Sequence, residues 1–286
     1  MIKTIAVMNM KGGVGKTTMT ANLAGSLAHF HQKKILIVDV DMQANLSQYF
    51  MEPEEYASWI KREGDFKKKE TVLSIYQKRR IVNPSTVRKK SKKEPPKLIL
   101  KNLTFRVYEN GNAYVDLIPS TLELMDLDTT NAENRLKIFL NTIKDKYDFI
   151  LIDCPPSMYF FTKSALIAAD SYLIPVKPDH LSSFGFVLLE KAIKQLEEDT
   201  EKNLIQIGTV FTLFKDTILM NRTMANMKAL RGRYFFDNYL KDLTGTGEAA
   251  AFNKLIFEYP RAIDNVAALK NITDEFISRI NDIENE

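Results

Sequence analysis

The chain has 286 residues, of which 45% are hydrophobic and 27% are charged, an ordinary composition for a globular protein of one large α/β domain or two small ones. A mean hydropathy of -0.21 and the lack of an apolar run of roughly 18–20 residues argue against a membrane protein. The one cysteine, Cys154, excludes an internal disulfide and a multi-cysteine metal site within one chain, and it favours a reducing cytoplasm.

The charge is distributed unevenly along the chain. The net charge is +4, but residues 61–101 hold 15 Lys and Arg against 4 Asp and Glu, so the remainder carries a net charge of -7. The densest part, residues 87–97, contains two prolines and few apolar side chains. Because such a stretch buries too little apolar surface to order itself, we predict an exposed, mobile loop there.

The apolar pattern predicts strands that alternate with helices. Short β-branched runs predict strands at 4–8, 35–39, 115–119, 149–153, 172–176 and 205–211. Helical spacing predicts helices at 15–30, 136–143, 189–196 and 265–284. This alternation indicates a doubly wound, mostly parallel sheet with flanking helices, whose ligands bind beyond the carboxyl ends of the strands. We expect one domain over residues 1–286, with a basic insertion at about 52–101.

A glycine-rich loop follows the first predicted strand. Residues 11–18 read Lys-Gly-Gly-Val-Gly-Lys-Thr-Thr and lead into a predicted helix. Glycines let successive N–H groups point at a phosphate, and the helix N-terminus adds partial positive charge. In such a loop Lys16 reaches the β- and γ-phosphates and the Thr17 hydroxyl ligates Mg²⁺. The ordinary P-loop pattern requires Gly at position 10, but the chain has Met10 there and an additional lysine, Lys11.

This loop resembles the deviant Walker A box of the ParA/MinD group of P-loop ATPases. The resemblance implies a P-loop NTPase fold, Mg²⁺-dependent hydrolysis of ATP, and an ATP-bound homodimer. It identifies Lys11 as the lysine that touches the nucleotide of the other subunit, and Lys11 and Lys16 as catalytic. The residues that it implies for nucleotide binding are Lys11, Gly12, Gly13, Val14, Gly15, Lys16, Thr17 and Thr18.

Two carboxylate positions extend the resemblance. Residues 39–43, Asp-Val-Asp-Met-Gln, resemble the family's Asp-x-Asp-Pro-Gln box, which implies that Asp41 orients or activates the attacking water. Met42 replaces the usual proline, and Asp39 would lie nearer the metal. A hydrophobic strand followed by Asp153 is the Walker B pattern, so we expect Asp153 and Thr17 to hold Mg²⁺.

Two later segments resemble the parts of the family that surround the nucleotide base. Residues 174–179 resemble the Pro-Val-x-Pro segment, and residues 208–214 resemble the strand that ends beside adenine. Pro178 and Thr212 are therefore candidates for contacts with the base.

The phosphate loop by itself does not choose among the functions of the group. A MinD-like protein has a basic amphipathic helix that binds membrane, but here the last 15 residues are acidic, so we expect no membrane partner. A nitrogenase-reductase-like protein needs two cysteines per subunit, whereas this chain has one. A DNA-partitioning ATPase of the ParA/Soj type, acting on a plasmid or chromosome, needs neither. The resemblance implies a cytoplasmic, nucleoid-associated protein that a ParB-like centromere-binding adaptor stimulates.

Two groups of basic residues are candidates for non-specific, salt-sensitive DNA binding, although charge runs are often simply solvated. The first comprises Lys215, Arg222, Lys228, Arg231 and Arg233, and the second comprises Arg88, Lys89, Lys90, Lys92 and Lys93. Two alternatives remain open. One is a nucleotide-switched positioning scaffold of the same family that binds a protein partner but not DNA, and the other is a P-loop enzyme that activates a small molecule.

Overall fold

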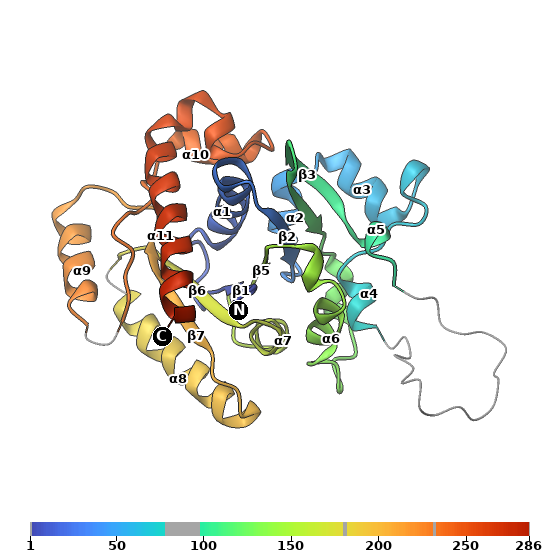
Figure 1. Cartoon of the computed structure of the whole chain (residues 1–286), viewed down its shortest axis with the longest axis horizontal. Coiled ribbons are helices and arrows are strands. Elements are labelled where there is room, and N and C mark those ends of the chain that lie inside the picture. Colours follow the sequence, from blue (N-terminus) through green and yellow to red (C-terminus); the bar gives the residue numbers. More distant parts are fainter. Residues whose placement is uncertain (1, 78–97, 180–181, 231–232, 286) are drawn as a thin grey trace.

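The computed structural model describes residues 2–77, 98–179, 182–230 and 233–285 (Figure 1). The strands of these residues form one sheet in the order β3-β4-β2-β5-β1-β6-β7, in which β3 is antiparallel to β4 and every other pair is parallel. The predicted doubly wound, mostly parallel sheet is therefore confirmed. The strands are β1 (Thr4–Val7), β2 (Lys34–Asp39), β3 (Phe105–Asn110), β4 (Ala113–Ile118), β5 (Phe149–Asp153), β6 (Ser171–Val176) and β7 (Ile205–Phe211).

Helices connect the strands and extend the C-terminal part. The α-helices of the described residues are α1 (Lys16–His31), α2 (Asn45–Phe50), α3 (Pro53–Lys61), α4 (Leu73–Tyr76), α5 (Leu100–Leu103), α6 (Arg135–Asn141), α7 (Phe160–Ala168), α8 (Ser182–Thr200), α9 (Ile218–Lys228), α10 (Thr244–Ala251) and α11 (Val266–Asn285). The short 3-10 helices are η1 (Gly64–Phe66), η2 (Leu122–Asp126), η3 (Lys144–Lys146), η4 (Ile256–Glu258) and η5 (Pro260–Asn265). Helices α1, α6, α8 and α11 lie where the helical spacing predicts them.

Both faces of the sheet are covered, as Figure 1 shows. Along β2, Leu36 and Val38 face a core that α6, α7 and α8 complete, whereas Ile35 and Ile37 face a second core shared with α1 and α11. All four side chains are fully buried. Burial on both faces is the physical reason for the near-continuous apolar runs of the strands.

Strand β3 is absent from the predicted set. It is the edge strand of the sheet, and it forms a hairpin with β4 whose turn contains Gly111 at φ 63°. Its side chains are mostly half-buried or exposed, so its sequence lacks the apolar run that marks the central strands. The Asn-Gly-Asn turn at residues 110–112 is the signal that indicates this hairpin.

The described residues of the expected insertion at 52–101 pack into the fold. They form α3, η1, α4 and the start of α5, and both Trp59 and Leu103, at the end of α5, are completely buried. The predicted loop at 87–97 lies outside the described residues. The described parts of the insertion thus belong to the two cores and are not a separate appendage.

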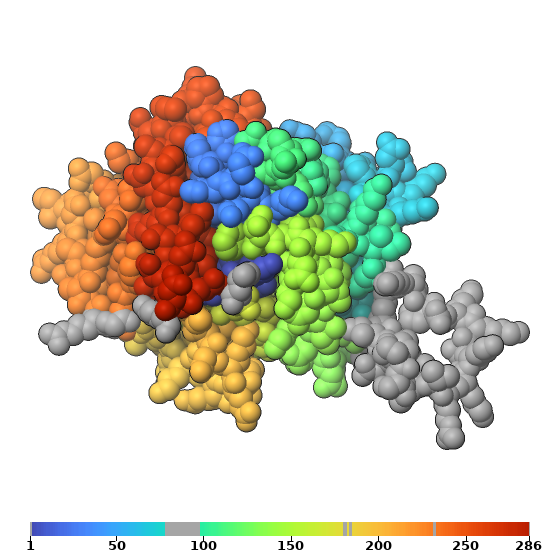
Figure 2. All heavy atoms as spheres, viewed as in Figure 1, coloured from blue at the N-terminus to red at the C-terminus, as the bar shows by residue number. Residues whose placement is uncertain are grey.

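The C-terminal helix α11 packs beside α1, and the two helices lie side by side on the surface in Figure 2. The buried Thr273 hydroxyl, on α11, donates a hydrogen bond of 2.8 Å to Ser26 Oγ on α1. Within the described ranges, no helix combines the length and the apolar composition that crossing a membrane requires.

Candidate nucleotide-binding site

The phosphate loop connects β1 to α1 at the carboxyl edge of the sheet. Gly13 and Gly15 have φ values of 67° and 77°, in the left-handed region that side chains other than glycine rarely adopt. Gly15 is also the N-cap residue of α1. The loop therefore curls so that backbone N–H groups and the positive end of α1 converge, which is the arrangement that binds phosphate.

Two side chains hold this loop against the neighbouring strands. Asn9 Nδ2 donates to the Pro175 carbonyl at 2.8 Å, while Asn9 Oδ1 accepts from the Lys11 backbone N–H at 3.0 Å. On the other side, the Thr212 hydroxyl donates to the Val14 carbonyl at 2.6 Å. Thr212 is buried behind the loop and supports it, and its contact with the base stays a prediction. Asn9 was not among the predicted site residues.

Lys16 lies beneath the loop with its side chain mostly buried. Its ammonium donates to the Lys11 carbonyl at 3.2 Å. Burial lowers the pKa of Lys16, and the nearby carboxylates of Asp153 and Asp41 oppose that shift. Burial removes part of the water that would stabilise this ammonium. A phosphate group bound in the loop would stabilise it instead, through its negative charge.

Asp153, at the end of β5, meets the first turn of α1. The Thr17 hydroxyl donates to Asp153 Oδ2 at 2.7 Å, and the Thr20 hydroxyl lies 3.2 Å from Oδ1. Burial raises the pKa of Asp153 to about 7. No group of three or more His, Cys, Asp or Glu among the described residues could hold a metal ion. The Thr17 and Asp153 oxygens nevertheless fit Mg²⁺, which takes one or two carboxylates and completes its shell with water and phosphate.

The loop after β2 contains the two carboxylates of the predicted box. Asp39 is fully buried and accepts hydrogen bonds from the Ser47 backbone N–H at 2.8 Å and the Ser47 hydroxyl at 2.7 Å. Burial, reinforced by the charge of Asp153, raises the pKa of Asp39 to about 8. Asp39 therefore anchors the start of α2, and Asp41 is the carboxylate of this loop whose charge acts on Lys16.

The Asp41 carboxylate is fixed by its own turn. Asp41 Oδ1 accepts from the Gln43 backbone N–H at 3.0 Å, and the Asp41 carbonyl accepts from the Ala44 N–H at 2.9 Å. Ala44 has a φ of 53°, and Met42, which replaces the family's proline, packs against the core that contains α6 to α8. These contacts hold Asp41 in position although residue 42 is methionine and not proline.

Lys11 forms an ion pair with Asp179, in the loop between β6 and α8. Asp179 Oδ1 also accepts from the Ser182 hydroxyl at 2.9 Å. The expected contact of Lys11 is with a nucleotide in another subunit, so within one chain Lys11 has a different, anionic partner. Pro178, the second candidate for the base, is buried directly before Asp179. Asp179 was not predicted as a site residue.

The sequence is similar to a known family and to known proteins along most of its length. A family model described as an AAA domain, AAA_31, matches residues 2–207. The sporulation initiation inhibitor protein Soj of Bacillus subtilis is 30% identical, in an alignment that covers 91% of this chain and 92% of that protein. The chain belongs to the ParA/Soj family of partition ATPases.

Two further similarities agree with this membership. The chromosome-partitioning ATPase Soj of Treponema pallidum is 29% identical, and the alignment covers 97% of this chain and 98% of that protein. The fold also matches the crystal structure of a Borrelia burgdorferi plasmid partition protein bound to AMPPNP. That match has a TM-score of 0.72 and 22% identity, and it covers 98% of this chain and 100% of that one.

Four of the ten DNA-binding candidates of this ParA/Soj family member lie within the described residues. Lys215, Arg222 and Lys228 are exposed, and Lys215 pairs with Asp242 at 3.2 Å. Arg233 is different, because its guanidinium forms a two-point ion pair with Glu190. The remaining candidates lie outside the described residues, namely Arg231, Arg88, Lys89, Lys90, Lys92 and Lys93.

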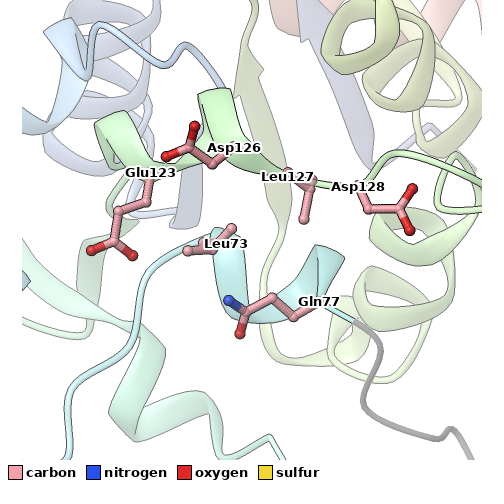
Figure 3. Close-up of a pocket in the computed structure, with 6 residues that line it drawn as sticks. All are labelled: Leu73, Gln77, Glu123, Asp126, Leu127 and Asp128. Atoms are coloured by element: carbon pink, nitrogen blue, oxygen red, sulfur yellow. The ribbon is translucent and has the colours of Figure 1, made fainter.

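An acidic hollow of about 440 Å³ is lined by residues outside the phosphate loop (Figure 3). Helix η2 and the segment after it supply Glu123, Asp126 and Asp128, and α4 with its C-cap residue supplies Leu73 and Gln77. The hollow contains none of the predicted nucleotide-binding residues. Three carboxylates would repel a triphosphate, so this hollow is not a second nucleotide pocket.

Proposed function

We propose that this chain is a Mg²⁺-dependent ATPase that partitions plasmid or chromosomal DNA through an ATP-bound dimer. The observation that supports it most is the convergence of Lys16, Thr17, Asp153 and Asp41 at one edge of the sheet, beside a phosphate-binding loop. Each of these groups has a defined task in phosphoryl transfer to water.

Residues 11–18 would bind the triphosphate through backbone N–H groups and the Lys16 ammonium. Thr17 and Asp153 would hold Mg²⁺, which when bound neutralises charge on the β- and γ-phosphates. Asp41, fixed by its hydrogen bond from Gln43, would orient the attacking water. Hydrolysis would be slow until an adaptor of the ParB type stimulates it.

Lys11 would connect nucleotide occupancy to pairing of the subunits. In one chain its ammonium is neutralised by Asp179. In the dimer it would exchange this carboxylate for the γ-phosphate bound by the partner subunit, where charge is more concentrated. ATP would thereby favour the dimer, and loss of the γ-phosphate would favour separate subunits.

DNA binding by the dimer would use exposed basic residues that contact phosphates without reading bases. Lys215, Arg222 and Lys228 are the described residues that fit this task, since all three are exposed. Arg233 is the weakest candidate, because its ion pair with Glu190 has two contacts and leaves its side chain only 19% exposed. Lys215 and Lys228 also pair with carboxylates, Asp242 and Asp237, but their side chains stay 60% and 34% exposed. Such binding would place the protein in the cytoplasm, on the nucleoid.

The test is the binding of random duplex DNA to the full chain, with and without ATP, over a series of salt concentrations. We expect binding that requires ATP, falls steeply with salt and is lost in Lys16→Ala. An ATP-dependent dimer that binds no DNA even in low salt would instead indicate the nucleotide-switched scaffold. ATP hydrolysis that depends on a metabolite, and not on DNA or an adaptor, would indicate a small-molecule enzyme.

A further inference from the structure

A second cleft, of about 500 Å³, lies at the β3–β4 edge of the sheet. Its walls come from α3, η1, α5, the β3–β4 hairpin and η3, and none of its residues belongs to the phosphate loop. It is rich in two kinds of side chain, cationic and aromatic. The cationic residues are Lys69, Lys101, Arg106 and Lys146.

Within the described ranges, Lys69, Lys101 and Lys146 form no ion pair. The Lys69 ammonium donates to the carbonyls of Lys101 and Thr104, at 2.8 and 3.2 Å. Burial, followed by repulsion from Lys101, lowers the pKa of Lys69. An anion in the cleft would relieve this repulsion.

Asp116, the carboxylate that lines the cleft, already accepts hydrogen bonds from two neighbouring side chains. Asp116 accepts from Arg106 Nε at 2.5 Å and from the Tyr147 hydroxyl at 2.9 Å. The Arg106 guanidinium in turn lies 3.9 Å from the centre of the Tyr114 ring. Asp116 therefore pairs with Arg106, and its charge also acts on Lys69, so Lys101 and Lys146 are the cations of the cleft that remain for a ligand.

The aromatic lining adds a preference for a flat, apolar group beside the anion. Phe66, Phe105 and Tyr114 line the cleft and are only half-buried, and Phe66 and Phe105 both pack on Trp59. Aromatic rings beside phosphate-binding cations form the platforms on which nucleobases stack. The volume exceeds that of one phosphate ion and lies in the range of small-molecule sites.

We propose that this cleft binds one nucleotide unit, with its phosphate at Lys101 and Lys146 and its base against Phe66 and Phe105. The unit could belong to a free nucleotide or to single-stranded nucleic acid, because both present the same phosphate and base. The site is independent of the proposed ATPase function, since it shares no residue with the phosphate loop.

Trp59 provides a local signal for the experiment. It is the one tryptophan of the chain, it lines the cleft, and the centre of its ring lies 4.7 Å from the Lys69 ammonium. We would titrate the full chain with thymidine 5′-monophosphate, and separately with a single-stranded ten-residue oligothymidylate, while recording Trp59 emission. Equilibrium dialysis of the labelled monophosphate gives the stoichiometry directly. We expect saturable binding of one unit per chain.

Variants localise the binding. In Lys101→Ala/Lys146→Ala, affinity should fall at least roughly tenfold, because two charge-assisted contacts are lost. The matched control, Lys137→Ala/Lys144→Ala, removes the same charge from exposed lysines outside the cleft and should bind normally. The Lys16→Ala variant should also bind normally, which separates this site from the phosphate loop.

The two probes distinguish a free nucleotide from single-stranded nucleic acid as the natural ligand. Comparable affinity for both indicates a free nucleotide, and binding of the oligomer at much lower concentration indicates single-stranded nucleic acid. No binding of either probe by dialysis, unchanged affinity in Lys101→Ala/Lys146→Ala, or loss of binding in Lys16→Ala would each overturn the inference. Equally strong competition by inorganic phosphate would overturn it as well, because the base would then contribute nothing.

Discussion

Asp39 and Asp41 are two residues apart, but their carboxylates have different partners. Asp39 is fully buried and accepts two hydrogen bonds from Ser47, whereas Asp41 accepts one from the Gln43 backbone. Asp39 therefore stabilises the loop, and Asp41 retains lone pairs that can orient a water. Substitution of each residue should separate stability from catalysis.

For Asp41→Ala we expect ATP binding to persist, and ATP hydrolysis to fall roughly hundredfold because the water loses its orienting group. For Asp39→Ala we expect a loss of about 1–3 kcal/mol in the free energy of unfolding, because a buried Ser47 N–H loses its acceptor. Phosphate release and urea unfolding, measured on both variants, check this. Equal destabilisation by the two substitutions would contradict the division of roles.

The raised pKa of Asp153 predicts that the free energy of unfolding depends on pH. Burial raises its pKa from 3.8 to about 7, so between these values the folded chain binds a proton that the unfolded chain does not. The ionisation of Asp153 therefore lowers the stability of the wild type as the pH rises from 4 to 7. Relative to it, Asp153→Asn should gain free energy of unfolding over that window, by at most about 1.4 kcal/mol per pH unit, and no more above it.

Urea unfolding of both proteins at several pH values, without nucleotide, measures this difference. A difference that does not change with pH would show that Asp153 ionises normally. The same variant should lose the dependence of nucleotide binding on Mg²⁺, because the metal loses its carboxylate ligand.

The residues of the site differ in how far the sequence predicts them. Lys16 and Thr17 lie in one contiguous motif, and Asp153 ends an apolar strand, so the local pattern is sufficient. Asn9 and Asp179 were missed because their roles depend on partners distant in the chain. Asn9 bonds to Pro175, 166 residues away, and Asp179 pairs with Lys11, 168 residues away.

Among the elements, the buried parallel strands are predictable because burial on both faces imposes an apolar run. Edge strand β3 is not, since its exposed face admits polar residues such as Arg106 and Glu109. The local sequence pattern also does not predict which helices pack against one another. The sequence of α10 contains Gly245 and Gly247, and only the fold shows that they have different surroundings.

At Gly245 a Cβ atom would lie 2.0 Å from the Arg261 carbonyl oxygen of η5, whereas at Gly247 it would meet nothing within 4 Å. Gly245→Ala should therefore lower the free energy of unfolding by about 1–3 kcal/mol, because backbone must move. Gly247→Ala is the matched control and should raise it by up to about 1 kcal/mol through helix propensity. Urea unfolding measures both, and equal effects would contradict this packing of α10 on η5.

For the whole molecule, the proposed cycle depends on whether Lys11 leaves Asp179 for a second subunit. Lys11→Ala should retain part of its ATP binding through Lys16 and the loop N–H groups, but it should lose the ATP-dependent dimer. Sedimentation with and without ATP measures the dimer. A dimer unchanged in the variant would rule out a role for Lys11 across the interface.

The DNA-binding surface is also a property of the whole molecule, because a salt-dependent affinity sums over every phosphate contact. Helix α9, which carries Arg222 and Lys228, lies at the outer edge of the molecule (Figure 1). Arg233 is close in sequence but is paired with Glu190 and lies over the Phe186 ring. These residues should therefore contribute unequally to DNA binding.

In Lys215→Ala/Arg222→Ala/Lys228→Ala, the slope of log affinity against log salt should become shallower by about 2–3, since each lost phosphate contact removes about 0.9. The control, Lys144→Ala/Lys191→Ala/Lys194→Ala, removes the same charge from exposed lysines elsewhere and should keep the slope. Arg233→Ala should also keep the slope while lowering stability, because it leaves Glu190 without its partner. An equal change of slope in the triple variant and its control would mean that net charge, and not this surface, governs the binding of DNA.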